Sequence, residues 1–296
     1  MGVIALDATA LILVGFGALL AGFTTGLTGF GTGLVASGVW FHVLPPETVP
    51  PLVALSSVAA QLVGLIAVRK AFDWRRAGPF LAGGAVGVPI GVTTLSIVSP
   101  LLLRTVIGVF LLAYASIELF GRSRLGVPSL KSRPADGCIG LGGGFLGGFA
   151  GLSGPLPLIW LQVTDRNATA DAHRAIYQPF NLMILTLAGI GMAVAGQITA
   201  DVLFIAALCL PATLLGSWIG ARLYKPISAK RFRRLVLALL LLSGTILIVQ
   251  AFGGQALIRQ SREQMPAAHA QATASGGLRL FRRQCSAQDA QQNDDG

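Results

Sequence analysis

The chain has 296 residues, of which 53% are hydrophobic and only 11% are charged, with a mean hydropathy of +0.72. A soluble domain carries roughly 25% charged residues, so this composition excludes a soluble globular protein. The formal net charge is +10, but the lysines and arginines lie between long apolar segments and near the C-terminus. This distribution is typical of membrane topology rather than of a nucleic-acid-binding face, so we expect no nucleic-acid partner.

Eight apolar blocks with few or no charges follow one another along the chain. Most are about 20 residues long, the length of a helix that spans roughly 30 Å of hydrocarbon, and they are apolar on every face. The first block follows no basic leader and exceeds the roughly 7 to 15 residues of a signal-peptide core, so we expect it in the mature protein. The pattern predicts an all-α polytopic membrane protein. The blocks are residues 8–46, 48–68, 78–98, 105–120, 138–164, 175–200, 202–221 and 235–252.

Two blocks are too long for one straight crossing. Residues 8–41 would form a helix of about 50 Å, and residues 138–164 one of about 40 Å. Each contains glycines near its middle, in residues 26–33 (GLTGFGTG) and 151–157 (GLSGPLP). Glycine permits non-helical dihedrals and proline removes a helix donor. We therefore predict that both helices break or fold back there, and that a new half-helix has Pro155 in its first turn.

Close packing between transmembrane helices is the alternative role for these glycines. However, residues 26–29 (GLTG) align with residues 151–154 (GLSG) at an offset of 125. A second pair, residues 87–91 (GVPIG) and 216–220 (GSWIG), aligns at an offset of 129. The shared core in both over-long blocks favours a functional break, and the two pairs together indicate an internal repeat.

The basic residues predict how often the chain crosses the membrane, because loops rich in Lys and Arg face the cytoplasm. If every block crosses once, 13 of the 22 Lys and Arg residues fall on one side, which is almost no bias. If the two over-long blocks fold back at their glycines, 16 fall on one side. We therefore predict cytoplasmic basic loops and periplasmic termini. The two halves are then inverted repeats, each a broken or re-entrant glycine-rich helical segment plus three transmembrane helices.

This topology predicts four regions. Residues 1–120 form the first transmembrane repeat, residues 121–136 a basic cytoplasmic linker, and residues 137–252 the second repeat. Residues 253–296 are polar and rich in Gln, Ala and Ser, so we expect a disordered tail.

Few side chains in the apolar blocks could carry chemistry. Glu118 and Arg222 lie near block ends, where snorkelling to the membrane surface explains them. No carboxylate relay or catalytic motif is present, so we expect no enzyme activity. The three cysteines are far apart and only three histidines accompany them. We therefore expect no disulfide framework, no metal site and no cofactor.

Backbone groups, hydroxyls and amides remain as candidate ligands. Two broken helices that face each other would direct freed N–H groups and the positive ends of their dipoles at one point near the membrane midplane, a site that prefers a small anion. Each hydroxyl or amide has an alternative role in helix packing. Thr24 lies near the first break. The candidate substrate-binding residues are Thr25, Thr28, Gly29, Gly31, Thr32, Gln61, Ser153, Gly154, Gln178 and Asn181.

Two glycine-rich segments stand out, residues 22–31 (GFTTGLTGFG) and 142–155 (GGGFLGGFAGLSGP). Together with the layout in two halves and the Gly-xxx-Gly pair of each third segment, they resemble the TauE/SafE sulfite exporter family of anion transporters. The resemblance covers about residues 8–252. It implies a multi-pass protein of the bacterial inner membrane that moves sulfite, organosulfonates or related sulfur-containing anions.

The expected function is that of a secondary transporter that alternates access between inverted repeats. An anion-selective channel and a non-transporting membrane scaffold are the alternatives. The expected partners are a small anion and the lipid bilayer, and assembly as a homo-oligomer stays open. Pro155 and Pro157 stand where the first repeat has Phe30 and Thr32, so the site is not expected to be fully symmetric.

Overall fold

The computed structural model describes residues 7–68, 73–121, 132–165, 168–223 and 236–250. The chain divides into a unit of residues 1–248, which holds almost all of the described helices, and a unit of residues 249–296. Most of the predicted basic linker and the whole predicted tail lie outside the described residues.

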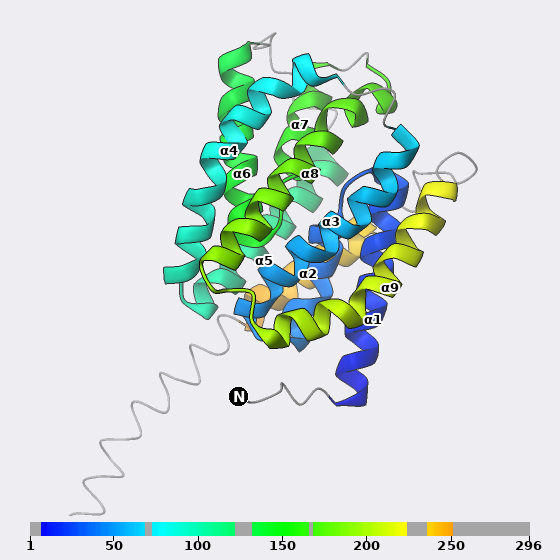
Figure 1. Ribbon diagram of the computed structural model, residues 1–296, viewed down its shortest axis with the longest axis vertical. Coiled ribbons are helices and arrows are strands. Elements are labelled where there is room, and N and C mark those ends of the chain that lie inside the picture. Colours follow the sequence, from blue (N-terminus) through cyan, green and yellow to red (C-terminus); the bar gives the residue numbers. More distant parts are fainter. Residues whose placement is uncertain (1–6, 69–72, 122–131, 166–167, 224–235, 251–296) are drawn as a thin grey trace, which may run out of the picture. The chain divides into compact units, whose positions relative to one another are not determined.

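The described residues form helices and no strands (Figure 1). Within these residues, five helical segments are long and apolar enough to cross a membrane, namely Ala8–Thr28, Trp74–Ile97, Pro100–Leu119, Asp171–Val194 and Ala200–Leu223. The predicted all-helical class is therefore confirmed. The elements are α1 (Ala8–Thr28), α2 (Thr32–Val43), η1 (Pro46–Thr48), α3 (Val49–Val68), α4 (Trp74–Ile97), α5 (Pro100–Ser116), η3 (Ile117–Gly121), α6 (Arg133–Ala150), α7 (Pro155–Thr164), α8 (Ala170–Val194), α9 (Ala200–Leu223) and a last described helix (Val236–Gln250).

Side-chain caps fix where several helices begin. The Asp7 carboxylate accepts a hydrogen bond from the N–H of Ala10 (2.7 Å), and the Thr169 hydroxyl accepts one from Ala172 (3.2 Å), at the starts of α1 and α8. Ser99 caps α5 in the same way. Each cap satisfies a donor that has no partner inside the helix.

Both glycine segments break their helices, as the sequence predicts. α1 ends at Thr28, and Gly29 and Gly31 have φ of 82° and 112° before α2 begins. α6 ends at Ala150, where Gly151 has φ of 73°. A residue with a Cβ is strained in this left-handed region, so the breaks depend on glycine at these three positions.

Each broken segment folds back on itself. The indole N–H of Trp40 in α2 donates to the carbonyl of Val14 in α1 (3.1 Å), and Trp160 in α7 donates to the Asp136 carboxylate near the start of α6 (2.7 Å). A straight helix would separate residues 14 and 40 by about 39 Å. α2 and α7 therefore return along α1 and α6.

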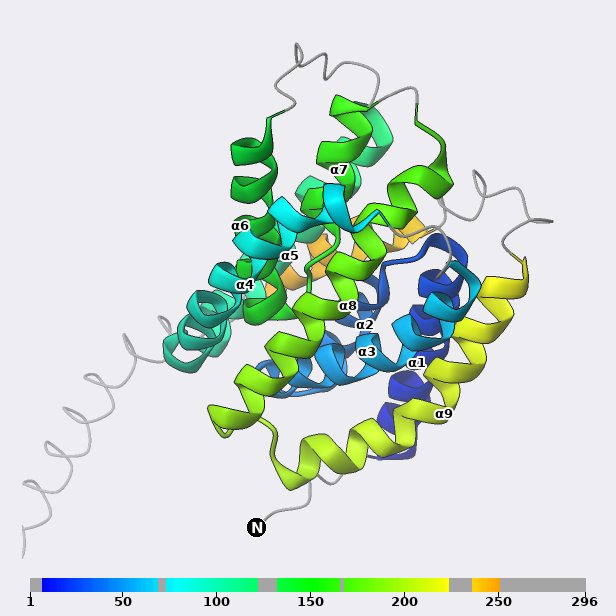
Figure 2. The same cartoon turned by 45° about the horizontal axis from the view of Figure 1, so that its top comes forward.

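The main helix–helix interfaces join the first half of the sequence to the second. α9 lies against α1, and α4 lies against α6 (Figure 2). Backbone contacts backbone at both interfaces. A Cβ added to Gly220 would lie 2.1 Å from the carbonyl oxygen of Phe23, and one added to Gly91 would lie 2.2 Å from that of Phe145. The packing role of glycine therefore applies to these Gly-xxx-Gly pairs.

The register that relates the two halves differs from the one that the sequence suggested. Gly29 and Gly151 end equivalent helices and are 122 positions apart (151 − 29), not 125. Phe23 and Phe145, which make the equivalent glycine contacts, are also 122 positions apart (145 − 23). The sequence alignment placed Gly26 on Gly151, but Gly26 lies inside α1, where an added Cβ would meet the α9 backbone at 2.0 Å. Gly91 of α4 and Gly220 of α9, which contact Phe145 and Phe23, are 129 positions apart, as in the sequence alignment.

Several helix ends place basic residues at one end of the bundle. α4, α6 and α8 begin where α3 and α9 end, and the turn between α8 and α9 lies at the opposite end (Figures 1 and 2). At the first of these ends, the N–H of Asp73 donates to the Ala175 carbonyl (3.3 Å), and Arg76 forms an ion pair with Asp165 (2.8 Å). We call it the basic end.

Glu118 and Arg222 have different environments. Glu118 lies in the π-helical turn Ile117–Gly121 and is only 7% exposed, so the prediction that it snorkels is wrong. A π-turn inserts a residue and changes the face on which the following side chains lie. Arg222 is exposed, and its guanidinium lies 3.8 Å from the ring centroid of Trp218.

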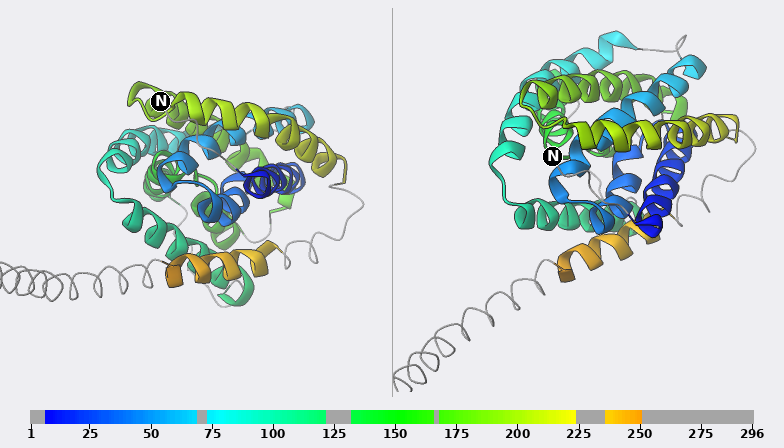
Figure 3. Two further views of the ribbon diagram at one scale, coloured as in Figure 1. Left: turned by 90° about the horizontal axis from the view of Figure 1, so that it is seen from below. Right: turned by 60° about the horizontal axis from the view of Figure 1, so that its bottom comes forward.

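The last described helix packs along the hairpin of α1 and α2. The Ser243 hydroxyl donates to the Gly38 carbonyl (2.6 Å) and lies 3.1 Å from the His42 ring nitrogen. Figure 3 shows this helix and α9 on opposite faces of the bundle. The broken segment of the first half is thus covered on both sides.

Candidate functional site

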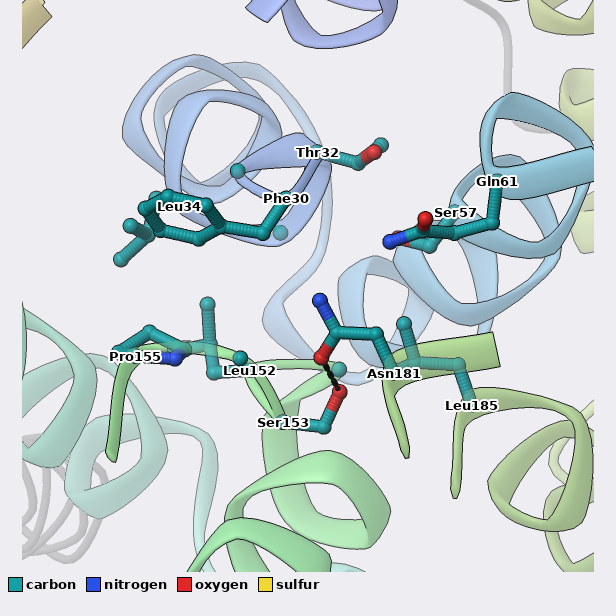
Figure 4. Close-up of a pocket in the computed structure, with 14 residues that line it drawn as sticks. Phe30, Thr32, Leu34, Ser57, Gln61, Leu152, Ser153, Pro155, Asn181 and Leu185 are labelled. Atoms are coloured by element: carbon teal, nitrogen blue, oxygen red, sulfur yellow. Dashed lines mark hydrogen bonds between the residues drawn. The ribbon is translucent and has the colours of Figure 1, made fainter. Parts of the chain in front are cut away.

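The two helix breaks meet inside the bundle. A Cβ added to Gly33, in the first turn of α2, would lie 2.5 Å from the carbonyl oxygen of Gly151. A small pocket, with a cavity volume of about 10 Å³, lies between the breaks and is bordered by α3 and α8 (Figure 4). A cavity needs roughly 10–15 Å³ to hold one water molecule, so this pocket has room for about one water, and a larger ligand requires the two breaks to move apart.

The first turn of α2 presents backbone donors to this pocket. Thr32, Gly33 and Leu34 open the helix and line the pocket, so their N–H groups have no acceptor one turn earlier. No other acceptor for these three groups is found among the described residues, and no side chain caps this end. The positive end of the helix dipole, roughly half an elementary charge, therefore faces the pocket.

α7 contributes fewer donors than α2. It also begins at the pocket, after Gly154, which has no side chain to act as a cap. Pro155 and Pro157 lack an N–H group, so Leu156 supplies the remaining donor among the first three residues. The two prolines therefore make the two sides of the pocket unequal.

Two amide side chains reach the pocket from α3 and α8. Gln61 donates from its amide nitrogen to the Gly29 carbonyl (3.3 Å), and the Ser153 hydroxyl donates to Oδ1 of Asn181 (2.7 Å). The second bond leaves the amide nitrogen of Asn181 directed into the space between the breaks (Figure 4). Gln61 and Asn181 are each 2% exposed, so a ligand that meets them is shielded from bulk water.

Six of the ten predicted site residues line the pocket, namely Gly31, Thr32, Gln61, Ser153, Gly154 and Asn181. The other four, Thr25, Thr28, Gly29 and Gln178, lie outside the lining.

Local hydrogen bonds explain why the threonines of α1 are not at the pocket. The Thr28 hydroxyl lies within hydrogen-bond distance of the carbonyls of Thr24 (2.8 Å) and Phe30, and its single proton is donated to one or the other. The Thr24 hydroxyl donates to the Leu20 carbonyl (2.8 Å). These bonds are intrahelical or close the break, so both hydroxyls are engaged with the backbone of the first broken segment. The Thr25 hydroxyl bonds that of Thr32.

Arg174 and Tyr177 of α8 lie behind the pocket and were not singled out by the sequence pattern. Position alone places Arg174 among the loop charges, but its side chain is buried, with 3% exposure. Its guanidinium donates to the carbonyl of Gly26 (3.0 Å) and to Oε1 of Gln178 (3.2 Å), while the Tyr177 hydroxyl donates to the last turn of α1. Arg174, Gln178 and Asn181 are spaced i, i+4, i+7, which places them on one face of a helix. This polar face of α8 is the sequence pattern that could have identified Arg174.

Comparison with known proteins gives the family. Residues 14–247 match the family described as Sulfite exporter TauE/SafE. The chain belongs to this family. A Cupriavidus necator protein named "Probable sulfite/organosulfonate exporter TauE" is 29% identical over 219 residues, which cover 72% of this chain and 83% of the relative. No solved structure matches the chain with significance. The family resemblance predicted from the glycine segments is confirmed.

Proposed function

We propose that this TauE/SafE protein is a secondary transporter of small anions and that sulfite, organosulfonates or related sulfur-containing anions are its substrates. The family match and the name of the relative support the substrate class. The helices and the family support a membrane location, and we assign the protein to the bacterial inner membrane, with the basic end in the cytoplasm.

The observation that carries the proposal is the uncapped start of α2 beside the Asn181 amide nitrogen. Both offer donors to one small pocket, and its described lining contains no lysine or arginine. A hydrogen bond to a charged ligand contributes about 1.5–3 kcal/mol. A few neutral donors and a helix end can therefore bind an anion less tightly than an ion pair with lysine or arginine would. Weaker binding suits a transporter, because the ligand must also be released.

Ser153, Gly154, Gln61, Gly31 and Thr32 complete the proposed binding site. Gly29, Thr25 and Thr28 support it by shaping the first break, and Gln178 lies on the route toward the basic end. Each of the ten predicted residues thus keeps a place in the proposal, but with different roles.

Alternating access between inverted repeats is the proposed mechanism. α1, α3 and α9 run in one direction, and α4, α6 and α8 run in the other (Figure 1). Each broken hairpin packs on the third segment of the other half, through α1 with α9 and α4 with α6. Movement of one of these pairs against the other would open the pocket to one side at a time. Residues 1–120 and 137–252 are the proposed repeats.

Uptake of labelled sulfite into proteoliposomes tests this function. Flux that saturates with sulfite concentration and is inhibited by an organosulfonate is the expected result. Flux that stays linear with concentration would indicate a channel, and a lack of flux for all tested anions would favour a scaffold.

A further inference from the structure

A polar face of α8 connects the pocket to the basic end. Arg174, Gln178 and Asn181 lie on one side of this helix, and their positions span about 10 Å along its axis. Asn181 is at the pocket, and Arg174 lies within two turns of the start of α8, at the basic end. α3 packs against α8 and supplies Ser57 and Gln61, one turn apart.

In the described part of the chain, several buried polar atoms on α3 and α8 lack hydrogen-bond partners. Among the described residues, no partner is found for Nε2 of Gln178, Oε1 of Gln61, or the hydroxyls of Ser56 and Ser57. These side chains are at most 2% exposed. A buried polar atom without a partner costs about 1–3 kcal/mol, so several of them on two packed helices require an explanation. A route that water or a polar ligand occupies during transport would satisfy them.

The hydrogen-bond acceptors of Arg174 suggest how that route closes. The partners of its guanidinium include a backbone carbonyl, at Gly26, and an amide oxygen, at Gln178. These two acceptors are neutral, and an anion is a stronger acceptor for a guanidinium than either of them. Gly29 leaves room for this side chain, because an added Cβ would lie 2.6 Å from Nε of Arg174.

We propose that Arg174 is the residue that selects anions on a polar path between α3 and α8, where it exchanges the Gly26 carbonyl for the passing anion. The proposal rests on the proposed transport function, since it assigns the route to the same pocket. It adds a fixed positive charge that selects by charge, while the neutral donors of the pocket bind.

A charge-selectivity experiment tests the path without relying on sulfite transport. Ser57→Cys is placed in a chain whose Cys138, Cys209 and Cys285 are replaced by alanine. The rates of modification by an anionic and a cationic methanethiosulfonate reagent are measured in membrane vesicles of both orientations. From the side of the basic end, we expect faster reaction with the anionic reagent. Arg174→Gln should lower the anionic-to-cationic rate ratio by about tenfold or more, since removing one positive charge from the path changes the energies of the two reagents in opposite directions.

Two further variants separate selection from structure. Arg174→Lys should keep most of the charge preference. Tyr177→Phe should keep all of it, although it also removes a bond from α8 to the last turn of α1. An unchanged ratio in Arg174→Gln, an equal loss in Tyr177→Phe, or a cysteine at position 57 that no reagent reaches from the basic end would each overturn the proposal. A failure of the proposed transport function can be distinguished from a failure of the Arg174 proposal. If the transport function is wrong, wild-type proteoliposomes show no saturable sulfite flux, whatever the ratio of the two labelling rates.

Discussion

The glycines of the two breaks are required for different reasons. Gly29 has a φ of 82°, which a residue with a Cβ adopts only with strain, and it also borders Arg174. Gly154 has ordinary helical dihedrals, with φ of −75° and ψ of −36°. Space is what limits position 154, because an added Cβ would lie 2.7 Å from the amide nitrogen of Asn181.

Alanine at these two positions should therefore give different phenotypes. Gly154→Ala should fold normally and raise the KM for sulfite by about tenfold or more, since it displaces one donor to a charged ligand. Gly29→Ala should reduce the amount of folded protein, with a cost of at least about 1–2 kcal/mol. Detergent gel filtration gives the folded fraction, and proteoliposome uptake gives KM. Equal losses of folded protein in both variants would contradict this distinction.

The hydroxyls near the pocket also divide into two groups. Ser153 orients Asn181, so Ser153→Ala should weaken apparent sulfite affinity by about 2- to 12-fold, equivalent to about 0.5–1.5 kcal/mol. The Thr28 hydroxyl donates only to backbone carbonyls, so Thr28→Val should leave KM within about twofold of wild type. A comparison of KM values checks both, and a larger effect from Thr28→Val than from Ser153→Ala would place the anion elsewhere.

At the scale of the helices, two close interfaces hold the broken segments in place. α1 and α6 each carry glycines that let the backbone of α9 or α4 approach directly. The break of one half is therefore positioned by a helix of the other half. This arrangement makes the site sensitive to small changes far from the pocket.

Matched glycine substitutions test the importance of this close approach. Gly91→Ala should reduce the yield of folded protein several-fold, because its Cβ would lie 2.2 Å from the carbonyl oxygen of Phe145 and would push α4 from α6. Gly189→Ala is the control, since no atom lies within 4 Å of a Cβ added there. Gel filtration measures the yield of folded protein for the two variants. Equal yields would argue against an essential backbone contact.

For the whole molecule, topology is the simplest prediction. Ser132 precedes α6 at the basic end, and Ala195 follows α8 at the opposite end. In a cysteine-free chain, Ser132→Cys should react with an impermeant thiol reagent from the cytoplasmic side, and Ala195→Cys from the periplasmic side. Reaction of both from the same side would rule out the folded-back topology.

Sequence alone could predict the breaks but not the way in which the halves interlock. The breaks followed from two blocks longer than a membrane is thick and from glycines at their centres. The register was misjudged because Gly26, a packing glycine, and Gly151, a helix-ending glycine, occur in similar tetrapeptides. Arg174 was missed because a charge next to a loop is usually solvated, and its burial and its bond to the Gly26 carbonyl arise from tertiary structure.

The central claim is that an anion binds between the two breaks. The most direct measurement is the concentration dependence of sulfite uptake by proteoliposomes that contain wild type, Asn181→Leu or Gln197→Leu. Gln197 is a matched control, because its amide bonds Val92 and Ser96 outside the pocket. We predict saturable uptake in wild type and Gln197→Leu, and a KM at least about tenfold higher, or no uptake, in Asn181→Leu. Saturable uptake with the same KM in all three proteins would contradict the claim.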